Sequence, residues 1–269
     1  VVTPTQQGFH VGAHADADPL AHAAAGGFSI MQTFIGDPQA WKGHAVDHPG
    51  GAEGLKQDAA TAGVGLYIHA PYVINVATTN NRIRIPSRQI LARQVKLAAE
   101  VGARGVIVHG GHVSANDDPA VGFDNWRKAI EGLDLEVPIL IENTAGGANA
   151  MARHLDRIAM LWDAVASAKG AENVGFCLDT CHAHASGMDP AGLVDAIKSI
   201  TGRIDLVHLN DSRDAAGSGA DRHEVLGLGQ VDPEFLVEVV READTATILE
   251  TPGDAASHAA QVDWLRALM

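Results

Sequence analysis

Residues 175–182 read Gly-Phe-Cys-Leu-Asp-Thr-Cys-His, and this octapeptide indicates what the rest of the chain builds. The apolar run 174–178 has the composition of a buried strand. Asp179 stands at the end of that run, and His182 follows three residues later. A carboxylate and an imidazole, both common metal ligands, therefore leave one strand end together. The octapeptide predicts a metal site at the carboxyl end of a β-strand.

Five further segments end in the same way, with a short apolar run followed by His or Glu. They are Tyr67-Ile68-His69, Val106-Ile107-Val108-His109, Ile139-Leu140-Ile141-Glu142, Leu206-Val207-His208 and Thr247-Ile248-Leu249-Glu250. In a (β/α)₈ barrel the active site is built where the carboxyl ends of the strands meet. We therefore expect six strands to bring these side chains to one place.

The whole chain alternates strand-like and helix-like segments. Strands are expected over 8–14, 28–34, 64–69, 104–109, 138–142, 174–179, 204–209 and 246–250, and helices over 19–25, 52–62, 87–101, 124–131, 151–168, 191–200, 233–243 and 254–268. This pattern predicts an α/β fold, a closed (β/α)₈ TIM barrel, with an open doubly wound sheet as the alternative. The open sheet would favour Gly-x-Gly-x-x-Gly after the first strand, and residues 12–16 do not supply it.

At 269 residues and 46% hydrophobic, the chain has the length of one large barrel, and no linker divides it. We therefore expect a single domain over 1–269. No apolar run is long enough for a bilayer, and residues 1–5 lack a signal-peptide pattern, so we expect a cytoplasmic protein without a membrane partner. Cys177 and Cys181 form only a Cys-x₃-Cys pair. We interpret Cys177 as a core residue rather than a redox group or a soft metal ligand.

The candidate metal ligands form a set of five imidazoles and four carboxylates, too many for one ion. They are His69, His109, Glu142, Asp179, His182, His208, Asp221, His223 and Glu250. Nitrogen and oxygen ligands suit Zn²⁺, Mn²⁺ or Fe²⁺, and nine of them with one bridging carboxylate suit three ions. Paired metals stabilise both the attacking and the leaving oxygens of a displacement at phosphorus. The set therefore indicates phosphate ester hydrolysis.

The net charge of −14 argues against nucleic acid, because phosphate binding depends on Lys and Arg. Net charge is a poor guide here, since bound cations would neutralise Glu142, Asp179, Asp221 and Glu250. The acidic composition lowers the expectation of a DNA partner without removing it.

The motifs resemble those of the endonuclease IV family of apurinic/apyrimidinic (AP) DNA endonucleases. The similar segments are 69–75 (His-Ala-Pro-Tyr-Val-Ile-Asn), 108–111 (Val-His-Gly-Gly), 141–146 (Ile-Glu-Asn-Thr-Ala-Gly), 177–182 (Cys-Leu-Asp-Thr-Cys-His), 208–212 (His-Leu-Asn-Asp-Ser), 221–223 (Asp-Arg-His) and 249–252 (Leu-Glu-Thr-Pro). The seven motifs occur in order and span most of the chain. The resemblance implies a xylose-isomerase-like TIM barrel in a monomeric bacterial enzyme of base excision repair.

The resemblance also implies an activity. Such enzymes cleave duplex DNA 5′ to abasic sites, leaving a 3′-hydroxyl and a 5′-deoxyribose phosphate, and they remove 3′-blocking groups, with 3′-5′ exonuclease activity as a further expectation. They hold three zinc ions, and Mn²⁺ is an alternative at one or more sites. Carried over by position, His69 and His109 would hold the first ion, Asp179, His208 and Glu250 the second, and His182, Asp221 and His223 the third. Glu142 would bridge the first two and act as the catalytic residue.

The same resemblance implies DNA contacts. Tyr72 matches a residue that is inserted at the lesion. Gln39 stands where the family typically carries an Arg that enters the minor groove, so this chain lacks one cation there. Rim arginines are candidates for phosphate contacts, with solvated loop charges as the alternative interpretation. They are Arg82, Arg84, Arg88, Arg213 and Arg222.

Two other functions compete with DNA cleavage. A sugar or sugar-phosphate isomerase or epimerase on a similar barrel would need only Glu142, Asp179, His208 and Glu250, and it would leave the other five ligands without a role. A non-catalytic protein that binds metal or DNA ends is the third possibility. The number of bound metal ions distinguishes the isomerase from the nuclease.

Overall fold

A closed barrel of eight parallel strands forms the centre of the computed structural model, which describes residues 10–269. The strands are β1 (Val11–His14), β2 (Ile30–Phe34), β3 (Gly65–His69), β4 (Val106–His109), β5 (Ile139–Glu142), β6 (Val174–Asp179), β7 (Leu206–His208) and β10 (Thr247–Leu249). They follow one another around the barrel in chain order, and β1 closes it by pairing in parallel with β10. The predicted (β/α)₈ fold is therefore confirmed, and the open sheet is excluded.

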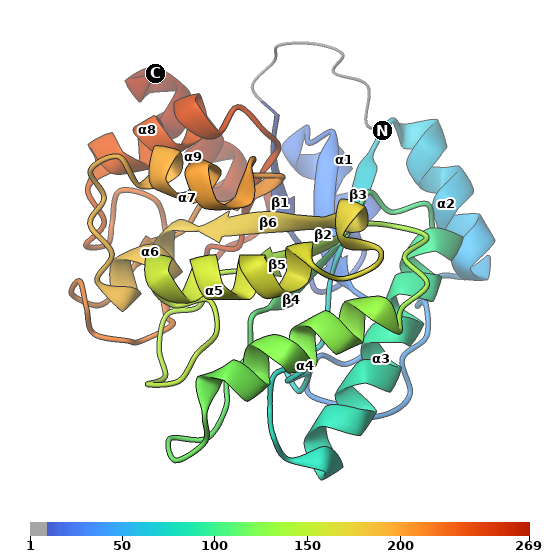
Figure 1. The fold of residues 1–269 in the computed structure, drawn as a ribbon. Coiled ribbons are helices and arrows are strands. Elements are labelled where there is room, and N and C mark those ends of the chain that lie inside the picture. The colour runs from blue at the N-terminus through green and yellow to red at the C-terminus, as the bar shows by residue number, and fades with distance from the viewer. Residues whose placement is uncertain (1–9) are drawn as a thin grey trace.

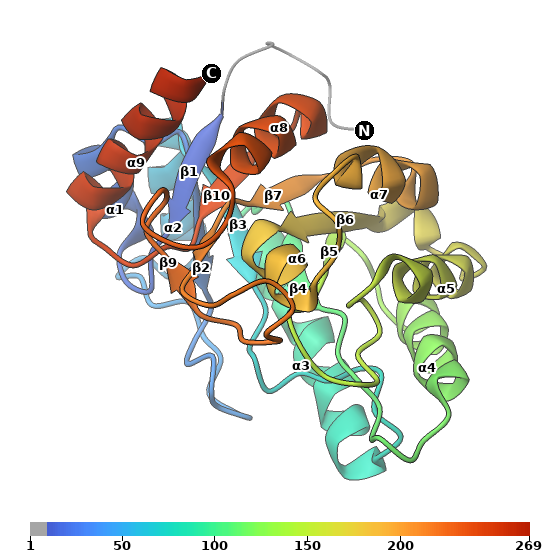
Figure 2. The ribbon, with the colours of Figure 1, turned by 90° about the vertical axis from the view of Figure 1, so that its left-hand side faces the viewer.

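Helices cover the outside of this barrel (Figures 1 and 2). They are α1 (Pro19–Gly26), α2 (Gly51–Ala62), α3 (Asn81–Glu100), α4 (Pro119–Glu131), α5 (Leu155–Ala166), α6 (Thr180–Ser186), α7 (Leu193–Thr201), α8 (Pro233–Ala243) and α9 (Ala255–Leu268), with a 3₁₀ turn, η1 (Ala171–Asn173). The last helix, α9, packs against the first, α1 (Figure 2). Among residues 10–269, none of the helices combines the length and apolar character that a bilayer crossing requires.

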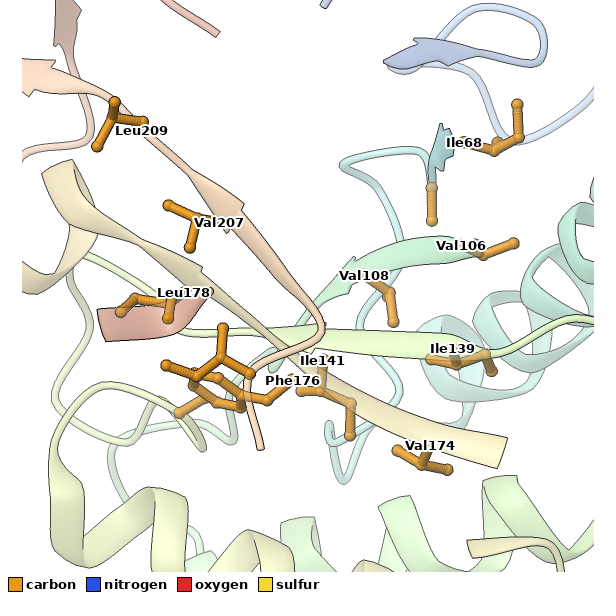
Figure 3. Packing of buried hydrophobic residues seen from close by; sticks show 14 of the residues in the cluster. Ile68, Val106, Val108, Ile139, Ile141, Val174, Phe176, Leu178, Val207 and Leu209 are labelled. Atoms are coloured by element: carbon orange, nitrogen blue, oxygen red, sulfur yellow. The ribbon is translucent and has the colours of Figure 1, made fainter. Parts of the chain in front are cut away.

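Each strand divides its side chains between two apolar layers. Outward residues such as Ile139, Ile141 and Phe176 pack towards the helices (Figure 3). Inward residues fill a smaller cluster within the barrel, made of Ile30, Tyr67, Ile107, Leu140, Cys177, Leu206 and Ile248. Because side chains alternate along a strand, the residue two positions after each inward one also faces inward. Cys177 is fully buried in this cluster, as expected of a core residue.

The boundaries of several elements differ from those expected. The first strand begins at Val11 within the described residues, and Gly8 and Phe9 of the expected strand lie outside them. Helix α3 begins at Asn81 rather than at residue 87, because Asn80 accepts a hydrogen bond from the Arg82 N–H and caps it. Pro86 lies inside this helix and does not end it. Pro86 has no N–H and so removes one hydrogen bond within the helix. The buried face of α3 after Pro86 offsets this loss.

A short helix and a pair of short strands after β6 were not expected from the sequence. Residues 180–186 form α6 directly at the end of the strand, where the Asp179 side chain accepts a hydrogen bond from the His182 N–H. This cap explains how Asp179 and His182 come to lie together. A short antiparallel pair, β8 (Asp211–Ser212) and β9 (His223–Glu224), then holds the loop that contains Asp221.

Asp211 fixes the backbone of residues 227–231, which follow β9, through hydrogen bonds. Its buried carboxylate accepts backbone hydrogen bonds from Gly227, Gly229 and Val231, at 2.9–3.0 Å. The first two go to Oδ2 and the third to Oδ1. Backbone N–H groups can only donate, so both positions must be occupied by acceptor oxygens.

We expect Asp211→Asn to lower the free energy of unfolding by about 2–4 kcal/mol, because its amide NH₂ would face backbone donors. Urea unfolding measures this change. Asp163→Asn, on the exposed side of α5, is the matched control and should change the free energy by less than about 0.5 kcal/mol. Equal stability of the two variants would contradict the role given to Asp211.

Candidate metal centre

A layer of polar side chains closes the carboxyl end of the barrel. Its members each follow an inward apolar residue by two positions, as Glu142 follows Leu140 and Asp179 follows Cys177. The members are Gln32, His69, His109, Glu142, Asp179, His208 and Glu250, and His14 of β1 lies beside Gln32. The predicted strand-end residues are therefore brought to one place. The alternation of the strands is what aims them inward.

Glu142 lies between two groups of imidazoles and is fully buried. Its Oε2 lies 3.3 Å from His69 Nε2 and 3.4 Å from His109 Nε2. Its Oε1 lies 3.1 Å from His208 Nδ1 and 3.2 Å from His182 Nδ1. One carboxylate thus presents a different oxygen to each group, which is the arrangement of a bridging ligand.

A second group surrounds His208. Its Nδ1 lies 3.2 Å from Glu250 Oε2, and ligand atoms of Glu142, Asp179, His208 and Glu250 all lie within 4.8 Å of one another. Asn210 donates a hydrogen bond of 2.6 Å to Asp179 Oδ2 and so orients that carboxylate. These side chains could share one metal ion.

A third group lies towards the barrel rim. Asp221 Oδ1 is 3.1 Å from His182 Nε2 and 3.3 Å from His223 Nε2. Asp179 also lies within 4.8 Å of both imidazoles, so it is a further candidate beside the expected Asp221. The Asp221 side chain is about half exposed, at 51%. This is the most open of the three groups.

Backbone carbonyls bond to one nitrogen of the His69 and His182 rings, and these bonds indicate the state of the other nitrogen, which faces the centre. Nδ1–H of His69 donates to the Ala70 carbonyl, and Nδ1–H of His182 donates to the Asn143 carbonyl. Each tautomer follows from its partner, because a carbonyl oxygen can only accept. In the neutral form of each ring, the Nε2 lone pair therefore points at a carboxylate. Two acceptors that face each other in a buried site are stabilised by a shared cation, so the residues fit metal ions.

The carboxylates of the centre are held ionised. Burial alone would raise the pKa of Glu142, but His208, His109 and His182 outweigh it and hold that pKa well below its usual value. Burial likewise opposes ionisation of Glu250, whose pKa is nevertheless lowered to about 2, chiefly by His208. The centre therefore offers negative charge to a cation at neutral pH.

The pKa values of two imidazoles in the centre shift in opposite directions. Burial lowers the pKa of His109 to about 4, so this ring is neutral and its lone pair is free near pH 7. Burial also opposes the charge on His223, yet the hydrogen bond to Asp221 and the Asp179 charge raise its pKa to about 9. Without metal ions, protons supply part of the positive charge that the carboxylates require.

Tyr72 stands over the centre at the rim of a hollow of about 400 Å³. Its side chain is 48% exposed, and its ring centroid lies 5.4 Å from that of His69 and 5.8 Å from that of His109. The Tyr72 N–H donates to the Pro38 carbonyl, next to the exposed Gln39. Tyr72 and Gln39 therefore belong to one surface beside the candidate metal centre.

Several of the rim arginines are engaged within the chain. Arg84 donates to the Thr78 and Thr79 carbonyls, and Arg88 donates to the Asn125 carbonyl. Arg222 pairs with Asp214, and Arg213 lies 3.4 Å from Glu224. Arg82 is exposed, and within residues 10–269 its guanidinium has no hydrogen bond or ion pair. Arg82 also lies in the first turn of α3 rather than in a loop.

Gln32, Asn143 and Asn210 also belong to the centre, although they are not among the residues expected there. Asn143 bonds to the backbone N–H and carbonyl of Asp179, and Asn210 contacts both Asp179 and Glu250. These amides are not usual metal ligands, so a search for His, Asp and Glu passes over them. Strand alternation was the available signal for Gln32, because it follows the inward Ile30 by two residues.

Comparisons with known proteins agree on the fold and narrow the family. The model of the xylose isomerase-like TIM barrel family matches residues 20–268. A protein of Mycobacterium ulcerans (strain Agy99), named "Probable endonuclease 4", is 53% identical over 245 residues, which are 90% of this chain and 92% of that protein. The crystal structure of endonuclease IV from Thermus thermophilus has a TM-score of 0.81 at 30% identity, over 96% of this chain and 98% of that one.

A more distant neighbour shows how widely the barrel is used. The crystal structure of a D-tagatose 3-epimerase-like protein has a TM-score of 0.78 at 18% identity, over 96% of each chain. At this identity the likeness concerns the fold alone.

We expect Zn²⁺ to raise the thermal midpoint of unfolding and a chelator to reverse the effect. Free zinc at about 1,000 times its dissociation constant adds about 4 kcal/mol to the free energy of unfolding. Calorimetry with metal analysis on the same sample measures both quantities. Mg²⁺ is the control, since it prefers oxygen ligands and should stabilise the protein far less. Identical midpoints with and without zinc would contradict the assignment of a metal centre.

Proposed function

Because the chain belongs to the endonuclease IV family of xylose isomerase-like TIM barrels, we propose that it is a DNA repair hydrolase of base excision repair. It would cleave the phosphodiester bond 5′ to abasic sites and leave a 3′-hydroxyl and a 5′-deoxyribose phosphate. The observation that carries this proposal is the position of Glu142, whose two oxygens face separate groups of imidazoles. Six of the nine candidate ligands line one hollow and the other three are buried beside them, and such a set suits chemistry at a phosphate.

We propose three zinc ions as the cofactor, with Mn²⁺ as an alternative at one or more sites. The proposed ligands are His69, His109 and Glu142 for the first ion, Glu142, Asp179, His208 and Glu250 for the second, and His182, Asp221 and His223 for the third. Bound zinc would stabilise negative charge on the phosphate and lower the pKa of the attacking water. One chain supplies all nine proposed ligands, so the centre needs no second copy to complete it, and we propose a monomer.

Glu142 is the proposed catalytic residue. Its pKa is held well below the usual value, so its carboxylate is ionised and can orient the attacking water, and it can accept the proton only of a water whose own pKa is lowered. It is fully buried and fixed by contacts on both oxygens, which keeps its orientation constant. The same groups would act on blocked 3′ ends, because a 3′-phosphate or 3′-phosphodiester presents the same bond. A 3′-5′ exonuclease activity would follow from the same reasoning.

Duplex DNA would lie over the rim, and Tyr72 would enter at the lesion. An abasic site lacks one stacking partner, so the duplex opens there at reduced cost and an aromatic wedge selects the damage. Gln39 lies beside Tyr72 and offers no positive charge to the phosphates of the DNA. Arg82 is free to contact a phosphate, whereas Arg84 and Arg222 are engaged within the protein.

The rival function is a sugar or sugar-phosphate isomerase or epimerase. The group Glu142, Asp179, His208 and Glu250 would serve it with one ion. Such an enzyme would have no use for the remaining imidazoles around Glu142, and the epimerase-like neighbour supports the fold alone. We therefore rank it below DNA cleavage.

The first experiment compares a duplex containing one tetrahydrofuran abasic analogue with an undamaged duplex, with metal content measured on the same sample. We expect a single cut 5′ to the analogue and two or three metal ions per chain. No cut with one bound ion would favour the isomerase.

We expect Glu142→Gln to lower kcat on this substrate by about 100-fold or more, because the amide cannot accept the proton. Binding of the abasic duplex should stay close to that of the parent protein, as measured by fluorescence anisotropy. Glu100→Gln, at the exposed end of α3, is the matched control and should retain full activity. Binding without cleavage by the parent protein, with every metal tried, would favour a non-catalytic DNA-end-binding protein.

We expect Gln39→Arg to tighten binding of abasic DNA, since it restores a cation beside Tyr72. The slope of log K against log salt concentration should become steeper by about 0.9 for the one added phosphate contact. Gln57→Arg, on the exposed side of α2, adds the same charge away from the rim and should leave the slope unchanged. If both variants changed the affinity and the salt slope equally, the tighter binding would come from net charge and not from the position of residue 39.

A further inference from the structure

We propose that Gln32 is a positioning residue of the metal centre, which holds His208 and Glu250 in the orientation that binds an ion. The inference rests on the proposed ligand set, since both partners belong to it. Gln32 lies on β2, is fully buried, and occupies the polar layer at the end of the barrel. It would contact no ion itself.

The contacts of Gln32 fix the direction of its amide. Oε1 lies 2.8 Å from His208 Nε2, and Nε2 lies 2.6 Å from Glu250 Oε1. The reverse orientation would set the amide oxygen against the Glu250 carboxylate, which can only accept. The second amide hydrogen points to His14 Nδ1, at 3.0 Å. Both donors and one acceptor position of the amide are therefore used.

This arrangement determines which atom of His208 is offered to a metal ion. In the neutral ring that metal binding requires, Nε2 carries the hydrogen that is donated to Gln32, so Nδ1 holds the lone pair. Nδ1 lies 3.1 Å from Glu142 Oε1 and 3.2 Å from Glu250 Oε2. Without Gln32, no acceptor at Nε2 would fix the tautomer of the ring, and a hydrogen on Nδ1 could face the carboxylates.

The two carboxylate oxygens of Glu250 also have different partners. Its Oε1 accepts from Gln32, which leaves Oε2 facing His208 Nδ1. Asn210 Oδ1 accepts a hydrogen bond from the Glu250 backbone N–H and so fixes the end of β10 as well. One buried amide thereby assigns a single inner atom to each of two ligands on different strands.

Gln32 is itself held in place from the rim. Because His14 Nδ1 accepts from the amide, His14 Nε2 carries the hydrogen, and it lies 3.1 Å from Asp16 Oδ1. This hydrogen bond lowers the pKa of Asp16 and keeps the carboxylate ionised. The chain of contacts from Asp16 through His14 prevents the amide from rotating away from Glu250.

The test compares Gln32→Met with Gln94→Met. Both glutamines are fully buried, but Gln94 donates to the Ile35 carbonyl and contacts none of the proposed ligands. Zinc content is measured after dialysis against buffers of graded free zinc concentration. We expect Gln32→Met to bind one of its ions about 10- to 100-fold more weakly, the size usual for loss of an outer partner of a metal ligand. Gln94→Met should keep the parent affinity at every site.

Three outcomes count against the proposal. Unchanged zinc affinity in Gln32→Met overturns it, and an equal loss in Gln94→Met overturns it by showing a general effect of core damage. A parent protein that binds no zinc overturns the proposed function and the ligand set together, so the two failures are distinguishable.

A measurement on the parent protein tests the same point if Gln32→Met fails to fold. In protein loaded with ¹¹³Cd and labelled with ¹⁵N-histidine, couplings to the metal identify the coordinating nitrogen of each ring. We expect His208 to couple through Nδ1 and to show an Nε2–H signal that is protected from solvent exchange. The signal is assigned with His208→Gln. Coupling of His208 through Nε2 overturns the inference.

Discussion

The central constraint on this molecule is that acceptor atoms face one another at the end of a buried barrel. The outer nitrogens of His69 and His182 give their hydrogens to backbone carbonyls, which leaves lone pairs pointing at carboxylates. Such a set is costly to bury without positive charge. The raised pKa of His223 and the lowered pKa of Glu250 show the same demand. The capping of α6 and the hydrogen bonds of the buried amides serve to hold these atoms in place.

The barrel supplies the geometry for this constraint through simple alternation. An inward apolar residue fixes the direction of the residue two positions later, so Leu140 directs Glu142 and Cys177 directs Asp179. The apolar cluster below and the polar layer above are thus parts of one pattern. The short pair β8 and β9 adds Asp221 and His223 from outside the barrel, and Asp211 holds the chain behind them.

The sequence was sufficient for the barrel and for most of the candidate centre, because strand ends carrying His or Glu are a local signal. It was insufficient where a role depends on a partner far along the chain. Arg84 and Arg222 looked like free rim charges, and their partners could only be seen in the folded chain. Gln32 was passed over because its importance lies in contacts with Glu250 and His208, far away in sequence. Because of Pro86, the sequence predicts a start of α3 that is too late. The cap at Asn80 and the buried face of the helix determine the true start at Asn81.

The two-residue alternation also limits how this chain can change in length over evolution. One residue inserted within β5 after Leu140 would move Glu142 from the inward face to the face where Ile139 and Ile141 pack against helices. The same holds for each strand that ends in a polar inward residue. Insertions and deletions are therefore tolerated between the elements, whereas the strands can vary in composition but must keep their register with the polar layer.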